Sequence, residues 1–319
     1  MKNFDADFYS RGELQLKRIL ISTSSYGMES NEPLNLMRSA GFEYILNPFN
    51  RKLTEEELQV LLQKYEPEYL IAGTEIISRK TLKLAKTFLR IISRCGTGID
   101  NVDIEAAKEM GIRVTNTPDA PTRAVAELTI GVLLDLLRGI SKADTAMREG
   151  KFDKKMGNLL YGKTVGLIGC GRIGTAVSEL LHAFGCRVIG YDSFIKTHKT
   201  IEMVTFNILL ERADIISLHI PYSEENEHII NRTVIEKMRE SLIILNVSRG
   251  GLIDEDALYD ALVSGRIKAA GLDCFEQEPY YGKLIESSKV VLTPHIGSYA
   301  IEARIEQEIA AVKNILNAN

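Results

Sequence analysis

The sequence of 319 residues has no tryptophan, eight prolines and four cysteines. The cysteines stand far apart and form no C-x-x-C pair, so a bound zinc ion is not expected and we assign no metal ligand. Reduced and mostly buried thiols in a cytoplasmic protein are expected instead. The four positions are Cys95, Cys170, Cys186 and Cys274.

The sequence also lacks any long apolar run and any basic cluster. No segment reaches the length of a membrane span, and residues 1–18 are polar, without the apolar region of a signal peptide. A net charge of -4 without a basic run makes nucleic acid an unexpected partner. A hydrophobic content of 45% is ordinary for a globular protein, and the length allows two domains.

The most informative stretch is a G-x-G-x-x-G motif formed by Gly169, Gly171 and Gly174. Residues 164–168 before it are mostly apolar and predict a buried parallel strand, and residues 175–184 after it predict a helix. In dinucleotide-binding folds the first glycine permits a tight turn, the second lets the pyrophosphate approach, and the third lets helix and strand pack closely. A glycine-rich turn without a ligand is the alternative, and the flanking elements make it the weaker one.

Two further features support a dinucleotide site. Free N–H groups at the helix N-terminus, around Arg172 and Ile173, would bind the phosphates. A second strand over residues 186–191 ends in Asp192, close to where a ribose-binding carboxylate is expected. No arginine follows Asp192 directly, so the pattern favours NAD over NADP.

Strands and helices alternate along the chain, which predicts parallel sheets with helices on both faces. In the first half we expect strands at residues 18–23, 42–47, 69–72, 90–94 and 112–116, and helices at 31–41, 54–65, 78–87 and 104–110. Two prolines within residues 117–122 mark the boundary of a first domain. Beyond it we expect helices at 123–142, 175–184, 208–213, 233–238, 254–264 and 300–317, and strands at 164–168, 186–191, 215–219, 242–247, 269–273 and 290–293.

Polar residues follow the predicted strands of the second half, at the edge where an open α/β sheet binds ligands. Arg249 follows one strand, Asp273 and Glu278 follow the next, and His295 follows the last. An arginine fork can grip a carboxylate, and a histidine beside an acid can donate or accept a proton near neutral pH. These parts suit hydride transfer between a cofactor and a 2-hydroxy or 2-oxo acid.

Each of these residues has a more ordinary interpretation when taken alone. Arg249 could be a surface ion-pair partner, His295 a loop or capping histidine, and Glu278 a turn residue. Their shared position at strand ends favours the functional interpretation. His219, at another strand end before Pro221, is a candidate for the wall of a cofactor pocket or for a purely structural role.

Seven segments together resemble the D-isomer-specific 2-hydroxyacid dehydrogenase family, and within it the phosphoglycerate-dehydrogenase-like branch. They occur in order over most of the chain and are RCGTGIDNVD (94–103), AVAELTIG (124–131), GLIGCGRIG (166–174), SLHIP (217–221), NVSRG (246–250), GLDCFEQEP (271–279) and LTPHIG (292–297). The resemblance implies an α/β fold of two doubly wound parallel-sheet domains. A Rossmann NAD-binding domain, residues 118–297, would be inserted in a flavodoxin-like split substrate-binding domain, residues 1–117 and 298–319.

The resemblance also implies an NAD-dependent D-2-hydroxyacid dehydrogenase and a role for each catalytic residue. His295 would be the acid/base, Glu278 its partner, and Arg249 the ligand of the substrate carboxylate and carbonyl oxygen. Asp273 would hold the nicotinamide amide. The family usually dimerises through the cofactor domain, so a homodimer is expected.

The implied ligand contacts fall into two sets. The cofactor set is Gly169, Gly171, Arg172, Ile173, Gly174, Asp192, His219, Pro221, Val247 and Asp273. The substrate set consists of Arg249 and the backbone N–H groups of Gly96, Thr97 and Gly98. A small 2-hydroxy or 2-oxo acid is the expected partner.

Two questions remain open at the level of sequence. Residues 71–75, IAGTE, lack the arginines with which some phosphoglycerate dehydrogenases hold the substrate phosphate, which argues against 3-phosphoglycerate. Because the chain stops at Asn319, the C-terminal regulatory domain and serine feedback of some relatives are not expected. An NAD-binding redox sensor that docks partners is the alternative function, because some relatives that act as corepressors keep all three catalytic residues.

Overall fold

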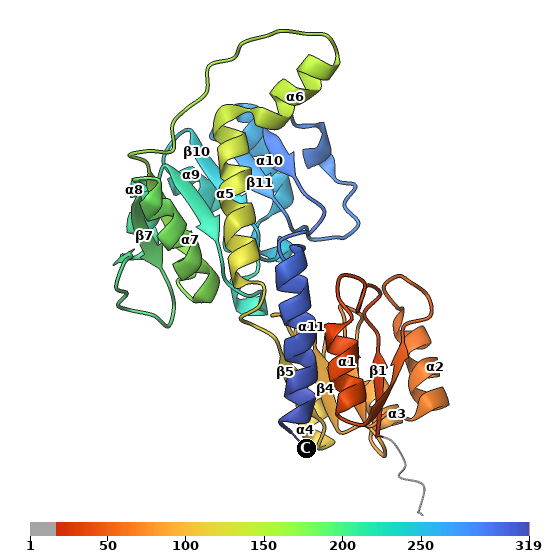
Figure 1. Cartoon of the computed structure of the whole chain (residues 1–319). Coiled ribbons are helices and arrows are strands. Elements are labelled where there is room, and N and C mark those ends of the chain that lie inside the picture. The colour runs from red at the N-terminus through yellow and green to blue at the C-terminus, as the bar shows by residue number, and fades with distance from the viewer. Residues whose placement is uncertain (1–16, 319) are drawn as a thin grey trace, which may run out of the picture. The chain divides into compact units, whose positions relative to one another are not determined.

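A computed structural model describes residues 17–318, so the polar lead-in over residues 1–16 lies outside the described residues. The chain divides into two compact units (Figure 1). The first comprises the chain up to Thr117 together with the segment from Ile305 onward, and the second is Pro118–Arg304. No helix among the described residues is long and apolar enough to cross a membrane.

The first unit is built on five parallel strands in the order β2-β1-β3-β4-β5. Their bounds are β1 (Lys17–Ile21), β2 (Phe42–Leu46), β3 (Tyr69–Ala72), β4 (Ile91–Arg94) and β5 (Arg113–Asn116). The helices are α1 (Glu32–Ser39), α2 (Glu55–Tyr65), α3 (Arg79–Ala85), α4 (Ile104–Glu109) and the part of α11 (Ile301–Leu316) from Ile305 onward. The strand order is that of a flavodoxin-like sheet, as expected.

Helices cover both faces of this sheet. One apolar cluster joins the strands to α1 and α11, through residues such as Met37 and Val312. The other joins them to α2, α3 and α4, through residues such as Leu62 and Leu82. Thr54 caps the N-terminus of α2, because its side chain accepts a hydrogen bond from the N–H of Glu57.

The second unit is built on seven parallel strands in the order β12-β11-β10-β9-β6-β7-β8. Their bounds are β6 (Thr164–Ile168), β7 (Arg187–Tyr191), β8 (Glu202–Met203), β9 (Ile215–Leu218), β10 (Leu242–Asn246), β11 (Ile267–Leu272) and β12 (Val290–Leu292). Numbered from β6, this is the Rossmann order 3-2-1-4-5-6 with one added edge strand. The strand order reverses between β6 and β9, so the ligand site is expected at the carboxyl ends of these strands.

Helices also cover both faces of the second sheet. They are α5 (Thr122–Arg138), α6 (Ile140–Arg148), α7 (Arg172–Ala183), α8 (Phe206–Arg212), α9 (Arg232–Lys237) and α10 (Glu255–Ser264), with short 3-10 turns η1 (Glu224–Asn226), η2 (Gly250–Leu252) and η3 (Lys283–Glu286). Helices α5 and α7 pack on one face and α8, α9 and α10 on the other. The predicted fold class, two doubly wound parallel-sheet domains, is confirmed.

Two predicted helices differ from the structure, and one short strand was not predicted. The single helix expected over residues 123–142 is wrong, because Gly139 adopts a left-handed conformation with φ 64° and ends α5. The side chain of Asp135 then accepts hydrogen bonds from the backbone N–H and hydroxyl of Ser141, in the first turn of α6. Helix α7 starts at Arg172, earlier than expected, and the two-residue strand β8 was not predicted.

The expectation that the cysteines form no disulfide and are mostly buried is confirmed. All four are free and buried in the structure. Burial raises the pKa of Cys186 to about 11, which is typical of an unreactive structural thiol.

Candidate active site

The three glycines of the β6–α7 turn differ in what an added Cβ would meet at each position. Gly169 has φ 98°, and a Cβ built on it would lie 2.6 Å from the carbonyl oxygen of His219. A Cβ on Gly174 would lie 2.1 Å from the carbonyl oxygen of Gly169, so helix and strand could not pack as they do. A Cβ on Gly171 would meet nothing within 4 Å. The open space beside Gly171 is where a pyrophosphate could approach the backbone.

The N-terminus of α7 presents backbone donors at this open space. The first N–H groups of a helix have no acceptor within the helix, and here they belong to Arg172, Ile173 and Gly174. The Arg172 side chain forms an ion pair with Asp119, 2.5 Å between Nε and Oδ1. The backbone at this position, rather than the guanidinium, is therefore the group that fits a phosphate.

Asp192 follows β7 and its carboxylate is held by backbone donors. Oδ2 accepts a hydrogen bond from the N–H of Cys170 at 2.9 Å, and Oδ1 accepts from Phe194 and Ile195 at 2.8 and 3.0 Å. Burial tends to raise the pKa of Asp192, but these donors and the charge of Lys196 outweigh it and lower the pKa. An ionised acceptor thus lies beside the glycine turn, in the position that suits the ribose hydroxyls.

His219 follows β9 under the same turn. Its Nε2 lies 2.9 Å from the Ser217 hydroxyl, and its buried Nδ1 has no partner among residues 17–318. Burial lowers the pKa of His219 to about 3, so the imidazole is neutral. A buried polar atom left without a partner fits a site that is completed by a ligand. Two other predicted cofactor residues lie at this edge: Pro221 is exposed beyond β9, and Val247 is buried at the end of β10.

The side chain of Asp273 holds the loop that carries His295 in place through hydrogen bonds. Its side chain is 1% exposed. It accepts hydrogen bonds from the Thr293 hydroxyl at 2.6 Å and from the N–H groups of Ile296 and Gly297, both at 2.8 Å. The carboxylate therefore fixes the residues on both sides of His295, in addition to the cofactor contact expected from the sequence.

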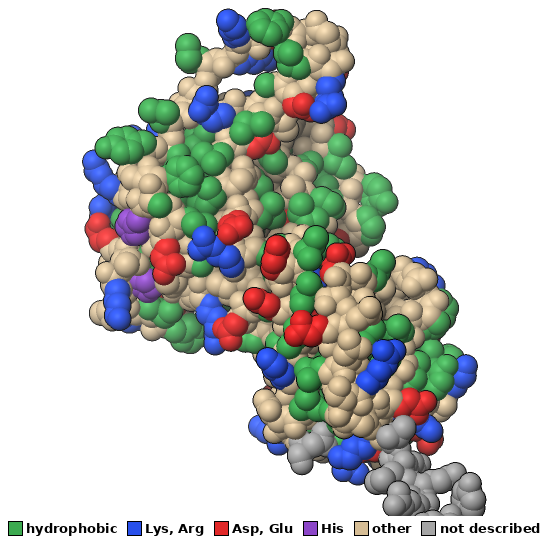
Figure 2. All heavy atoms as spheres, viewed as in Figure 1, with side chains coloured by type: hydrophobic (Ala, Val, Ile, Leu, Met, Phe, Trp, Pro, Cys, Tyr) green, Lys and Arg blue, Asp and Glu red, His purple; other side chains and the backbone are tan. Residues whose placement is uncertain are grey.

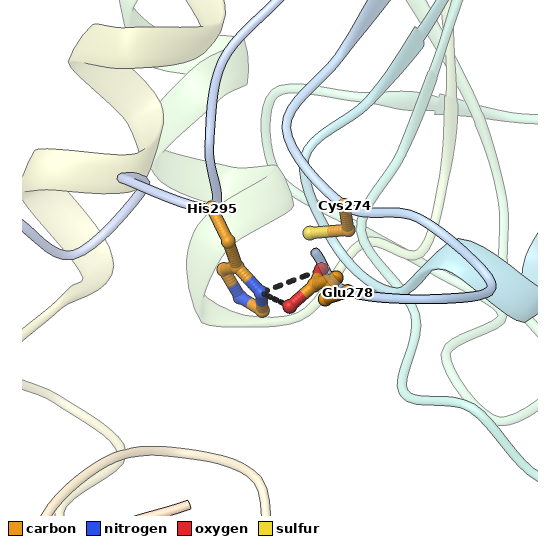
Figure 3. A group of neighbouring side chains, drawn as sticks. All are labelled: Cys274, Glu278 and His295. Atoms are coloured by element: carbon orange, nitrogen blue, oxygen red, sulfur yellow. Dashed lines mark hydrogen bonds and ion pairs between the residues drawn. The ribbon is translucent and has the colours of Figure 1, made fainter. Parts of the chain in front are cut away.

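His295 and Glu278 form a close pair (Figure 3). His295 Nδ1 lies 2.9 Å from Oε1 and 3.0 Å from Oε2 of Glu278. The histidine adopts a left-handed backbone conformation with φ 53°, an uncommon geometry for a residue with a side chain. Because the carboxylate can only accept, Nδ1 carries the proton of this bond. The other ring nitrogen, Nε2, has no hydrogen-bond partner among the described residues, and both side chains are about two-fifths exposed.

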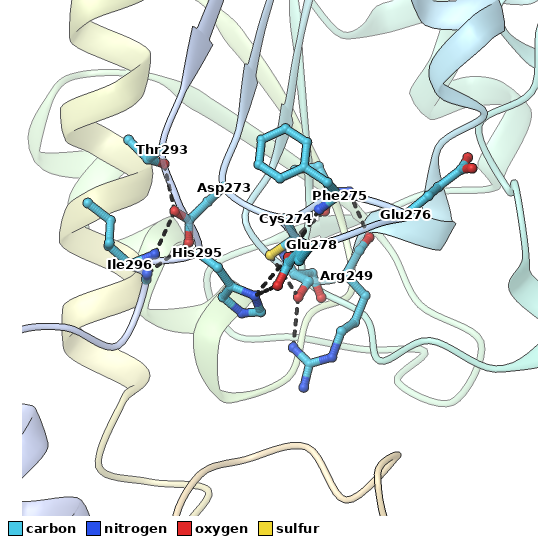
Figure 4. A network of polar contacts seen from close by, with 12 residues as sticks. Arg249, Asp273, Cys274, Phe275, Glu276, Glu278, Thr293, His295 and Ile296 are labelled. Atoms are coloured by element: carbon cyan, nitrogen blue, oxygen red, sulfur yellow. Dashed lines mark hydrogen bonds and ion pairs between the residues drawn. The ribbon is translucent and has the colours of Figure 1, made fainter. Parts of the chain in front are cut away.

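Arg249 is held at the end of β10 by a turn around Asn246. The Asn246 amide donates a hydrogen bond to the carbonyl oxygen of Arg249 at 2.7 Å, and its carbonyl accepts from the N–H of Ser248 at 3.1 Å. Figure 4 shows the Arg249 side chain beside Glu278 and His295, with Nη1 donating to the Ser248 carbonyl at 2.8 Å. The three predicted catalytic residues of the second unit are thus brought together.

The loop of Glu278 packs tightly on the turn that follows Arg249. A Cβ on Gly250 would lie 1.8 Å from the carbonyl carbon of Phe275, so only glycine allows this contact. Phe275 stacks on Tyr280 with ring centroids 4.3 Å apart, and its N–H donates to Glu278 Oε1 at 3.2 Å. Glu276, in the same loop, is instead paired with His228 at 2.9 Å.

The predicted substrate residues of the first unit follow β4. The N–H of Gly96 already donates to the Thr117 hydroxyl at 2.8 Å, which leaves it a structural role. The N–H groups of Thr97 and Gly98 have no acceptor among residues 17–318. A Cβ on Gly96 would collide with the Arg94 guanidinium, so this arginine, which we did not predict as a site residue, lies across the turn.

A comparison with known protein families identifies the family to which this chain belongs. Residues 130–297, more than half of the chain, match the model of the D-isomer specific 2-hydroxyacid dehydrogenase, NAD binding domain. The chain belongs to the D-isomer specific 2-hydroxyacid dehydrogenase family. It is therefore an NAD-dependent oxidoreductase, and NAD is its cofactor.

Individual relatives agree with this assignment. The chain is 41% identical over 300 residues to the hydroxypyruvate reductase of Thermotoga maritima. This alignment covers 91% of this chain and 97% of the relative. It is 44% identical over 260 residues to the D-3-phosphoglycerate dehydrogenase of Methanocaldococcus jannaschii, covering 79% of this chain and 49% of that relative. This chain thus spans about half the length of the Methanocaldococcus jannaschii relative. Among solved structures, the TT0316 protein of Thermus thermophilus superimposes with a TM-score of 0.86 at 34% identity, covering 94% of this chain and 96% of that one.

Cys274 lies beside the catalytic pair of the dehydrogenase. One potential ligand atom from each of Cys274, Glu278 and His295 lies within 4.8 Å of the other two, an arrangement that could hold a metal ion. Burial raises the pKa of the Cys274 thiol, and Sγ donates to the Ser248 carbonyl at 3.2 Å. A metal ligand must be a thiolate. The group is therefore better described as a histidine–glutamate pair beside a neutral thiol.

We expect the dehydrogenase to prefer NAD(H) to NADP(H). The 2′-phosphate of NADP would lie against the ionised Asp192, and like charges in a partly buried site repel by about one to a few kcal/mol, which predicts a preference of about tenfold or more. Lys196 offsets part of this, because its Nζ donates to the carbonyl oxygens of Asp192 and Ser193. Catalytic efficiency with both cofactors measures the preference, and equal use would contradict the role of Asp192.

Proposed function

We propose that the enzyme interconverts a small 2-oxo acid and its D-2-hydroxy acid, with Arg249, Glu278 and His295 as its catalytic residues. The observation that carries this proposal is the His295–Glu278 pair at the carboxyl edge of the second sheet. His295 Nδ1 is hydrogen-bonded to the Glu278 carboxylate, and His295 Nε2 has no partner among the described residues. A histidine fixed in this way can exchange one proton with a ligand through a defined atom.

The proposed roles follow from the chemistry of each side chain. NAD(H), when bound, supplies or accepts the hydride at C2 of the substrate. In reduction, His295 donates the proton that the carbonyl oxygen needs, and Glu278 stabilises the protonated imidazole and fixes its orientation. Arg249 holds the carboxylate and carbonyl oxygens through its planar fork. In oxidation, the neutral imidazole accepts the hydroxyl proton.

We propose the first unit as the substrate-binding domain and the second as the NAD-binding domain. The N–H groups of Thr97 and Gly98 are proposed to bind the substrate carboxylate, whereas the N–H of Gly96 is engaged with Thr117. The second unit contains the glycine turn, Asp192 and the whole of the matched family segment, residues 130–297. The two named relatives suggest hydroxypyruvate and 3-phosphoglycerate as candidate substrates.

A panel of substrates tests the proposed function. Glyoxylate, pyruvate, hydroxypyruvate and 3-phosphohydroxypyruvate would each be assayed with NADH, and the matching hydroxy acids with NAD. Turnover of at least one 2-oxo acid, with loss of turnover in the His295 variant described below, is the expected result. NAD binding without any turnover would favour the redox-sensor function instead.

The pH dependence of reduction tests the catalytic pair. Burial tends to raise the pKa of Glu278, but the hydrogen bond and charge of His295, the N–H of Phe275 and the charge of Arg249 lower it below its usual value. The carboxyl therefore stays ionised to lower pH and favours the protonated imidazole. Glu278→Gln removes this charge, so the alkaline fall of kcat/KM for reduction should move to lower pH, and oxidation should extend to lower pH.

A matched control for this experiment lies in the same loop. Glu276 is paired with His228 rather than with His295, so Glu276→Gln should keep the parental pH profile. If Glu276→Gln moved the alkaline limb and Glu278→Gln did not, the assignment of the partner acid would have to be exchanged.

We also propose that the enzyme is a homodimer joined through the second unit. Helix α6 and the segment after it extend away from the rest of this unit (Figure 1), and Figure 2 shows hydrophobic side chains along them. The exposed apolar residues there are Ile140, Met147, Phe152, Met156, Leu159 and Tyr161. Apolar surface on this scale fits a protein interface. Analytical ultracentrifugation should find twice the mass of one chain.

A further inference from the structure

A buried carboxylate, Glu75, lies at the carboxyl edge of the first sheet. Ser22 directly follows β1, and Glu75 stands three positions after the end of β3. These two strands are neighbours, and the strand order β2-β1-β3 reverses between them. In doubly wound sheets, ligands bind at such a reversal, outside the carboxyl ends of the strands. Glu75 thus occupies a position at which a ligand contact is expected.

The hydrogen bonding of Glu75 is incomplete. The side chain is 1% exposed. Oε1 accepts hydrogen bonds from the Ser22 hydroxyl and from the N–H of Gly73, the latter at 3.1 Å. Oε2 has no donor among residues 17–318 and faces Gly73, where an added Cβ would lie 2.8 Å away. An oxygen of a nearly buried carboxylate that accepts no hydrogen bond costs free energy, and a ligand that donates a hydrogen bond to it would remove that cost.

A second unpartnered group lies next to this carboxylate. The Thr23 side chain is 8% exposed, its Oγ1 has no partner among the described residues, and its Cγ2 would lie 3.2 Å from a Cβ on Gly73. The neighbouring backbone at Ser22 is held by the Asn47 amide, which donates a hydrogen bond to the Ser22 carbonyl at 2.7 Å. Two polar atoms without a partner among residues 17–318, Glu75 Oε2 and Thr23 Oγ1, indicate a contact for a polar ligand.

This contact adjoins the proposed carboxylate site of the first unit. The Asn101 amide donates to the carbonyl oxygens of Gly73 and Glu75 at 3.3 and 2.6 Å. Asn101 closes the loop that begins at Cys95 and contains Thr97 and Gly98. The N–H of Cys95 also donates to the Ala72 carbonyl at 2.8 Å. The two strand-end loops are therefore joined directly.

We infer that Glu75 determines substrate specificity by accepting a hydrogen bond from a hydroxyl group on C3 of the substrate. This inference rests on the proposed function, which places the substrate carboxylate on Thr97 and Gly98. A hydroxyl group has a proton to donate to Oε2. A phosphate ester at the same carbon has lost that proton and brings negative charge against the carboxylate. The substrate class is accordingly 2-oxo acids with a free 3-hydroxyl group, with their D-2-hydroxy counterparts.

The charge at this edge agrees with a single anionic group on the substrate. Arg94, at the end of β4, lies with its guanidinium across Gly96. That cation is beside the loop proposed to hold the carboxylate. Beside Glu75, by contrast, no lysine or arginine among residues 17–318 forms an ion pair with the carboxylate. A second anion on the substrate would therefore meet a negative charge rather than a positive one.

The experiment compares three substrates in the parent enzyme and in Glu75→Gln. Hydroxypyruvate, 3-phosphohydroxypyruvate and pyruvate are assayed with NADH, and kcat/KM is measured for each. The parent should prefer hydroxypyruvate to both others by about tenfold or more, the value of a hydrogen bond to a charged group. In Glu75→Gln the ratio of kcat/KM for hydroxypyruvate to that for 3-phosphohydroxypyruvate should fall by about tenfold.

The control is Glu56→Gln, which removes an exposed carboxylate on α2 in the same unit and should leave all three values unchanged. Thermal unfolding checks that Glu75→Gln is folded, and the selectivity of the parent gives a readout that does not depend on the variant. A parent that reduces no 2-oxo acid would overturn the proposed function and this inference with it. A parent that prefers the phosphorylated substrate, or a folded Glu75→Gln with the parental ratio, would overturn this inference alone.

Discussion

Replacing His295 with glutamine should lower kcat for reduction by roughly 10²- to 10⁴-fold, the usual contribution of a positioned acid or base. The glutamine amide can still form a hydrogen bond with the carbonyl oxygen, but it has no proton to transfer near neutral pH. Binding of NADH should be unchanged, because the glycine turn and Asp192 are untouched. Stopped-flow measurement of NADH oxidation, with a fluorescence titration of NADH binding, gives both values.

The control for this variant is another histidine of the second unit. The side chain of His182, near the end of α7, forms a hydrogen bond with the carbonyl oxygen of Thr200 and with no other group among residues 17–318. His182→Gln should therefore retain parental kinetics. If His295→Gln kept the parental kcat with chemistry shown to be rate-limiting, another group would have to supply the proton.

Replacing Arg249 with lysine should lower kcat/KM by about 10²-fold, the effect expected when a substrate is held in the wrong orientation. Lysine keeps the positive charge but loses the planar fork that matches a carboxylate. The turn held by Asn246 does not depend on the side chain of residue 249, because the Asn246 amide contacts its backbone carbonyl. The fold and NADH binding should thus survive.

Arg232→Lys is the matched control, because this exposed arginine forms a surface ion pair with Asp260 at 2.6 Å. Such pairs contribute little to stability. The variant should be indistinguishable from the parent. Parental kcat/KM in Arg249→Lys would reduce Arg249 to an ordinary ion-pair residue.

The fold was predictable because the local sequence patterns favour the same elements that tertiary packing stabilises. The helix expected over residues 54–65, the glycine turn after β6 and the βα alternation all appear in the structure. The break in the helix after Arg138 was missed because apolar periodicity continues across Gly139. The left-handed conformation at Gly139 is stabilised by Asp135, whose side chain caps the next helix. Periodicity does not report such a cap.

The site was predictable to the level of which side chains meet, because parallel strands bring their carboxyl ends to one edge. Arg249, Glu278 and His295 could be placed together on that basis. The hydrogen bonds of Asp273 could not, since they depend on the path of the loop from Thr293 to Gly297. A carboxylate at a strand end is visible in a sequence, but the number of its donors is not.

In the first unit, Glu75 and Gly96 also have contacts that could not be predicted from the sequence. In the sequence, Glu75 stood out only because its segment lacks the arginines found in some phosphoglycerate dehydrogenases. Its burial could not be predicted, because it results from the packing of Ser22 and Gly73 around it. Gly96 was expected to bind substrate, whereas its N–H is engaged with Thr117, twenty-one positions away in the sequence. Ser22 and Thr293 lay inside the strands expected over residues 18–23 and 290–293, so no strand-end signal marked them in the sequence.

The central claim is hydride transfer between the cofactor and C2 of a 2-oxo acid, with D stereochemistry. NADH labelled with deuterium at the transferred position, incubated with hydroxypyruvate and the enzyme, tests it most directly. Mass spectrometry and chiral chromatography of the product should find one deuterium at C2 of the D-2-hydroxy acid. Formation of the L isomer, deuterium at another carbon, or no labelled hydroxy acid with any 2-oxo acid of the panel would contradict the claim.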